Sequence, residues 1–133
     1  MKEILKLLIL LFCLNISCSP SSSSPAAPTP EPPITFTLDV SNASISLDSS
    51  FPVVVTLTSA LPTAKGINIE VTVTDQTNNT LLSQNTTVTS VLFKNSITII
   101  NLPQQHWCLA SVKVSSVSTP SNSASQSFTV VYK

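Results

Sequence analysis

The sequence predicts an all-β domain, an antiparallel β-sandwich of seven to eight strands, behind an N-terminal region of different character. From Ile34 onward, apolar and polar residues alternate with a period of two, which is the spacing of a strand with one buried face. Turn-forming clusters interrupt this alternation about every ten residues, over roughly a hundred residues. The composition is rich in Ser, Thr, Val, Ile and Asn, which favour strands and turns over helices.

The first four strands are expected at 34–40, 43–48, 52–59 and 67–75. In 34–40 the residues at positions 34, 36, 38 and 40 face inward, and in 43–48 the inward residues are Ala43, Ile45 and Leu47. The fourth segment, INIEVTVTD, alternates most clearly, with its isoleucines and valines on one face and its Asn, Glu and Thr residues on the other. A shift of one residue would turn every apolar side chain to water, so this pattern also determines the register.

The remaining strands are expected at 80–90, 96–102, 107–117 and 125–133. The segment 80–90, TLLSQNTTVTS, is polar, and we expect it at a sheet edge. In 107–117 the residues at positions 108, 110, 112 and 114 face inward, and in 125–133 the inward residues are Phe128, Val130 and Tyr132.

The charge distribution argues against several functions. The net charge is zero, 9% of the residues are charged and there is no arginine, so the chain lacks the basic cluster that nucleic-acid binding requires. One glycine in the whole sequence also argues against a phosphate-binding loop. Nucleic acid is therefore not an expected partner.

Residues that could support catalysis or metal binding are few and scattered. After the signal, the acids and the one histidine are spread along the chain: Glu31, Asp39, Asp48, Glu70, Asp75 and His106. His106 and Cys108 could supply two ligands from one strand face, but zinc needs three or four. We therefore predict a protein that is not an enzyme and binds no cofactor or metal, with Cys108 as a small buried side chain. The alternative is a hydrolase that uses His106.

The N-terminal region carries a secretory signal at 1–17. Two lysines precede the apolar segment LLILLFCL, which is too short to span a bilayer. Ser17 stands directly before Cys18, and the stretch resembles a bacterial lipoprotein signal, with Asn15 where the family pattern has leucine. The resemblance implies that Cys18 is acylated, with palmitate for example, and anchors the protein to a membrane of a bacterial cell envelope. The alternative is plain secretion, which would leave Cys18 free to form a disulfide bond with Cys108.

The segment 18–33 is expected to be a tether. Its sequence after Cys18, SPSSSSPAAPTPEPP, cannot bury apolar surface, and its prolines favour an extended chain. In polyproline II it would reach about 45 Å at roughly 3.1 Å per residue. A spacer of this kind lets a domain stand clear of the surface that holds its end.

The stretch NLPQQHWCLASVKVSSVSTPSNSASQSFTV resembles the late strands of fibronectin type III and related immunoglobulin-like domains. In those domains a Leu-Pro turn leads into an aromatic residue, an alternating strand, a polar loop and a final strand. The resemblance implies one such domain at 34–133, although Trp107 and Cys108 stand near the place of the usual corner tyrosine. The run PSNSASQSFTVVYK behind a short lipoprotein signal is also similar to small envelope lipoproteins of Bacteroidota.

Three neighbouring residues form a candidate binding site: His106, Trp107 and Leu109. If Cys108 faces the core, Trp107 and Leu109 face outward, and exposed tryptophan is common in interfaces and in sugar-stacking sites. The alternative, which we favour from the sequence, is that the linker or a loop covers Trp107, or that a bulge buries it. We expect a lipid-anchored module for protein interaction, adhesion or spacing. The second hypothesis is a carbohydrate-binding module that uses Trp107, with Tyr132 as a further stacking platform.

Overall fold

The computed structural model describes residues 29–62 and 65–133, with the backbone alone for 83–86. The predicted signal at 1–17, Cys18 and the tether as far as residue 28 lie outside the described residues. The described chain contains eight strands and no helix: β1 (Phe36–Leu38), β2 (Ala43–Ser46), β3 (Phe51–Leu57), β4 (Ile67–Asp75), β5 (Thr80–Ser90), β6 (Lys94–Ile99), β7 (Trp107–Ser116) and β8 (Ser123–Tyr132). Each segment that was expected to form a strand overlaps one, although β3, β6 and β8 begin one or two residues earlier than expected.

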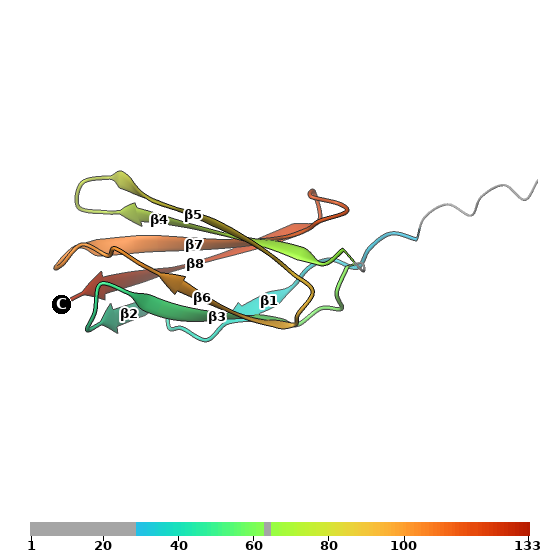
Figure 1. The fold of residues 1–133 in the computed structure, drawn as a ribbon, viewed down its shortest axis with the longest axis horizontal. Coiled ribbons are helices and arrows are strands. Elements are labelled where there is room, and N and C mark those ends of the chain that lie inside the picture. Colours follow the sequence, from blue (N-terminus) through green and yellow to red (C-terminus); the bar gives the residue numbers. More distant parts are fainter. Residues whose placement is uncertain (1–28, 63–64) are drawn as a thin grey trace, which may run out of the picture.

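The strands form two packed sheets, the architecture of a β-sandwich (Figure 1). One sheet has three strands in the order β1-β3-β6, and the other has five in the order β2-β8-β7-β4-β5. The polar strand β5 lies at the edge of the larger sheet, as expected. An aromatic contact joins the layers, because the rings of Phe51 in β3 and Phe128 in β8 lie 6.0 Å apart.

The core lies between the two sheets and is built from the alternating apolar residues. In β4 every second side chain is buried, and Ile67, Ile69 and Val73 are fully covered. In β7 the same holds for Cys108 and its successors on that face. The buried cluster takes residues from both sheets: Phe36, Val53, Val55, Leu57, Ile97 and Ile99 from the smaller, and Ile67, Ile69, Val71, Val73, Cys108, Ala110, Val112, Val114, Phe128 and Val130 from the larger.

For segment 43–48 the predicted buried face was wrong, and so was the predicted antiparallel pairing. Ile45 and Leu47 are 55% and 88% exposed, whereas Ser46 is buried. Ser46 faces inward because its hydroxyl, which has one proton to donate, lies within hydrogen-bond distance of the carbonyls of Asp48 (2.7 Å) and Ser50 (2.8 Å) and so closes the turn into β3. β2 also pairs with β8 in parallel, so the sandwich is not purely antiparallel.

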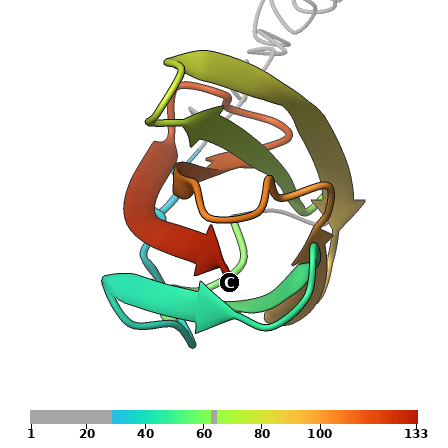
Figure 2. The same ribbon diagram turned by 90° about the vertical axis from the view of Figure 1, so that its left-hand side faces the viewer.

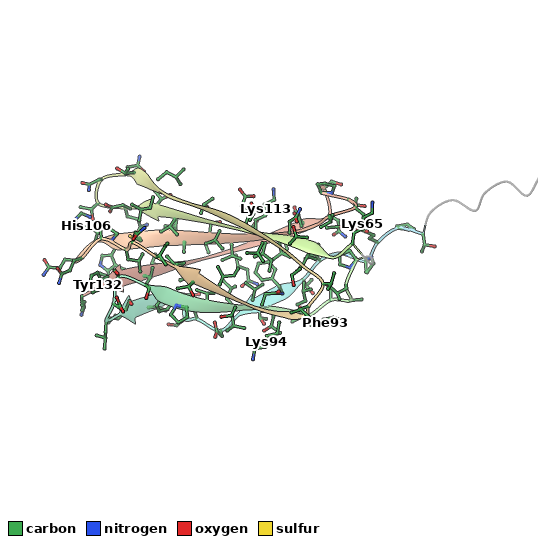
Figure 3. The ribbon with its side chains drawn as sticks, in the orientation of Figure 1. Lys65, Phe93, Lys94, His106, Lys113 and Tyr132 are labelled. Atoms are coloured by element: carbon green, nitrogen blue, oxygen red, sulfur yellow. The ribbon has the colours of Figure 1, made fainter. Side chains whose placement is uncertain are left out.

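The two ends of the sandwich differ in what they hold. The proximal end, where the chain enters the fold at Ile34, also holds Lys65 and Phe93 (Figure 3). The distal end holds His106, Tyr132 and the end of β8, and Figure 2 looks onto it. Asn122, in the β7–β8 turn, holds the entering chain, because its Oδ1 accepts from the amide of Ile34 at 3.1 Å and its Nδ2 donates to the carbonyl of Pro32 at 3.0 Å.

Candidate functional site

A carboxylate and an imidazole meet at the distal end. Asp75 is the last residue of β4 and is buried, and His106 immediately precedes β7. His106 Nδ1 lies 2.7 Å from Asp75 Oδ2. The carboxylate also accepts from the amide of Thr77 at 2.8 Å and from Asn78 Nδ2 at 3.1 Å. Asp75 thus closes the β4–β5 turn and binds it to the β6–β7 loop.

These bonds stabilise the ionised form of Asp75. The hydrogen bond from His106 is the largest influence and lowers the pKa of this carboxyl group, burial opposes it, and the backbone bonds add to the lowering. Because an ionised carboxylate only accepts hydrogen bonds, Nδ1 of His106 carries the proton that is shared with Asp75.

Cys108 stands directly across from Asp75 in the β4–β7 pairing, but it is not placed for chemistry. The thiol is fully buried and is directed to the backbone carbonyl of His106, at 3.9 Å. Burial raises the pKa of this thiol, and the negative charge of Asp75 raises it further, so the reactive thiolate is disfavoured. Within the described residues, no group of three or more His, Cys, Asp or Glu side chains is arranged to hold a metal ion.

Next to His106 lies a hollow of about 360 Å³, which is lined by Gln105, Trp107, Val131 and Lys133. Trp107 is 45% exposed and Leu109 is 37% exposed, so no described loop covers Trp107, contrary to expectation. The part of the linker before residue 29, which was the other expected cover, lies outside the described residues. The β7–β8 pairing runs without a bulge from Trp107↔Val131 to Ser115↔Ser123, and nothing therefore reverses the alternation.

The β6–β7 loop is held against the end of β8 and shapes one side of the hollow. The amide of Gln105 donates to the carbonyl of Tyr132 at 2.7 Å, and Gln104 forms an isolated parallel bridge with Tyr132. Gln105 and Asn101 both have positive φ, at 62° and 58°. Such a conformation costs roughly 1 kcal/mol in a residue other than glycine, and it persists where surrounding contacts enforce it.

The outer face of the five-stranded sheet carries exposed apolar side chains near the distal end. In the register, Trp107 lies across from Val131, and Val131 lies across from Ile45. In the next row Leu109 and Leu81 flank Thr74. Paired residues share a face, so these side chains form one surface, which we call the outer apolar patch: Ile45, Leu81, Trp107 and Leu109.

The side chains of the three candidate binding residues therefore do not all face the same way. Trp107 and Leu109 share the outer face, whereas His106 is directed to the buried Asp75. Tyr132 is half-buried and packs against the core, so it does not form a second platform beside Trp107. Ile45 and Leu81 could not be assigned to this surface from the sequence, because the pairing that aligns them with Trp107 and Leu109 is formed by distant strands. The predicted anchor Cys18 lies outside the described residues.

No protein-family model matches this chain, and comparisons with curated proteins and with solved structures found no match either. A membrane-spanning helix, long and apolar enough to cross a bilayer, does not occur in the described part of the chain.

Proposed function

We propose that this protein is a non-enzymatic, lipid-anchored module of a bacterial cell envelope, which presents its distal end to a protein partner. The lipoprotein-type signal ending at Cys18 and the Pro/Ser-rich segment behind it support the anchor and the tether. Among the described residues, the observation that carries the proposal is the separation of the two ends. The chain reaches the sandwich at the proximal end, whereas the hollow beside Trp107 lies at the distal end.

We further propose that the sandwich is immunoglobulin-like, as its late strands suggest. In immunoglobulin domains strands A, B and E lie in one sheet and strands G, F and C in the other, to which some members add C′. The orders β1-β3-β6 and β8-β7-β4-β5 follow the same arrangement, with β2 as an additional strand beside β8. This supports a scaffold that displays loops and a sheet face at one end.

The distal surface supports binding better than catalysis. Trp107 contributes a half-exposed aromatic ring, and the ends of β2, β5 and β7 surround it with further apolar side chains. Exposed aromatic residues in a hollow are typical anchors of interfaces. The Asp75–His106 pair, by contrast, is used to join two turns, and the neighbouring thiol of Cys108 is buried.

The anchor is tested by metabolic labelling with a palmitate analogue in a bacterial host. The wild-type protein should take up the label, and Cys18→Ser should not. Cys13→Ser is the matched control, because Cys13 lies inside the predicted signal and its loss should leave labelling intact. Equal labelling of the wild type and Cys18→Ser would contradict the anchor.

A second candidate function is carbohydrate binding, and the hollow beside Trp107 is the observation that favours it. An exposed indole ring can stack on a sugar, and the side-chain carboxamide of Gln105, a residue that lines the same hollow, can bond to hydroxyl groups. Without Tyr132 as a second platform, this site would rest on one aromatic ring.

A further inference from the structure

The turn between β5 and β6 exposes three consecutive apolar side chains. Val91, Leu92 and Phe93 are 57%, 62% and 52% exposed, and they separate Ser90, the last residue of β5, from Lys94, the first of β6. Consecutive exposed apolar residues are unusual on the surface of a soluble domain, and they indicate a contact with an apolar phase or partner.

Hydrogen bonds hold the backbone of this turn in place. The carbonyl of Phe93 accepts from the amide of Leu57 at 2.8 Å, and the carbonyl of Leu92 accepts from Asn95 Nδ2 at 2.9 Å. The amide of Leu92 donates to Ser90 Oγ at 3.0 Å. Because the backbone is tied to β3 and β6, the three side chains are displayed to the outside and do not fold back onto the core.

The β3–β4 loop lies directly against the same turn and brings a second lysine to it. Gly66 has a φ of 83°, and a Cβ at this position would collide with the carbonyl of Ser90 and lie 3.0 Å from Val91 Cγ1. Lys65 and Lys94 are both exposed, and Figure 3 shows them with Phe93 at the proximal end.

We propose that Val91, Leu92 and Phe93, flanked by Lys65 and Lys94, form a membrane-contacting site that seats the proximal end on anionic lipid. Apolar and aromatic side chains enter the boundary between headgroups and acyl chains, and lysines beside them attract anionic headgroups. The inference rests on the proposed function, because the anchor at Cys18 brings this end near the bilayer.

The length of the tether and the place where it meets the fold single out lipid as the occupant. Residues 19–33 separate Cys18 from Ile34, so the proximal end stays within roughly 45 Å of the membrane when this segment adopts polyproline II. Such tethering raises the effective concentration of the turn at the surface, and a contact too weak to bind a free protein then suffices. The outer apolar patch lies at the distal end, away from the tether, and takes no part in this contact.

The experiment uses the fact that Trp107 is the one tryptophan of the chain and lies at the distal end. Protein expressed from the full-length sequence in a bacterial host is reconstituted in vesicles of phosphatidylcholine and phosphatidylglycerol with brominated acyl chains, which quench tryptophan on contact. The double variant Trp107→Phe/Phe93→Trp moves the single indole to the turn and should be quenched roughly twofold or more. The wild type and the matched control Trp107→Phe/Leu81→Trp should be quenched little.

Flotation of the vesicles distinguishes a failure of the membrane contact from a failure of the lipid anchor at Cys18. Protein that floats and is quenched at position 93, less so in vesicles of phosphatidylcholine alone, supports the membrane contact. Protein that floats but is not quenched at position 93 overturns the contact and leaves the anchor intact. A blue shift of the indole at position 93 without bromine quenching indicates a protein contact or a second copy, and also overturns it. Protein that does not float overturns the anchor and, with it, the contact.

Discussion

The two ends of the sandwich both expose apolar side chains, but they hold them differently. At the proximal end Val91, Leu92 and Phe93 project from a turn between two lysines. At the distal end Trp107 and Leu109 lie on a sheet face, held in register by strand pairing. Side chains on a projecting turn can enter a soft phase such as lipid, whereas side chains fixed on a sheet face form a surface of constant shape. The difference suggests different partners for the two ends.

The largest effect is expected from Gly66→Ala at the proximal end. Alanine at positive φ is strained, and its Cβ would collide with the carbonyl of Ser90. We expect a loss of about 2–4 kcal/mol in the free energy of unfolding, measured by urea denaturation. The exposed Ser125→Ala in β8 should change it by less than about 0.5 kcal/mol. An equal effect of both changes would mean that the β3–β4 loop does not rest on the β5–β6 turn.

At the distal end, replacement of Asp75 by asparagine should change how stability depends on pH. The pKa of Asp75 is lowered from its ordinary value of 3.8, so its stabilising contribution is complete above pH 3.8. The contribution is lost as the pH falls below this value toward the lowered native pKa. The urea midpoint of the wild type should therefore exceed that of Asp75→Asn at pH 7, and the difference should shrink at pH 3.

The exposed Asp48→Asn serves as the control for this comparison, because it removes a carboxylate whose hydrogen bond is to Ser49 and not to His106. A difference between the wild type and Asp75→Asn that stays constant from pH 7 to pH 3 would show that the bond to His106 does not stabilise the ionised carboxylate.

The smallest effect on stability is expected at Trp107, where the change should appear in binding. Trp107→Ala should cost about 1 kcal/mol of stability or less, because the ring is 45% exposed. If the distal hollow binds sugars, signal on a glycan array should be lost in Trp107→Ala and kept in Phe93→Ala, which removes an aromatic ring at the other end. Circular dichroism of both variants checks that the fold is retained. Absence of glycan binding by the wild type would leave the protein-partner proposal as the better one.

Strand identity and the buried face of the long strands could be predicted from sequence because both are local properties. In β4 and β7 the alternation extends over nine and ten residues. A single choice of face buries every isoleucine and valine of β4, and in β7 it buries the apolar residues from Cys108 to Val114 on that face while Trp107 and Leu109 stay on the outer face. The four residues of β2 carry too little of this signal, and the hydroxyl bonds of Ser46 to the turn outweighed the burial of Ile45. Exposure of Trp107 depended on whether distant segments cover it, which its own neighbours in sequence do not determine.

The amino-acid sequence by itself determined an all-β chain, its strand segments, the polar edge strand and the scarcity of reactive groups, since alternation, turn residues and composition act over a few positions. Only the tertiary structure decided that β2 runs parallel to β8, that Ile45 and Leu81 join Trp107 and Leu109 on one surface, and that Asp75 meets His106 from 31 positions away. These depend on which strands pair and how two sheets close on each other, and the free energy of that closure is shared by residues far apart in the chain.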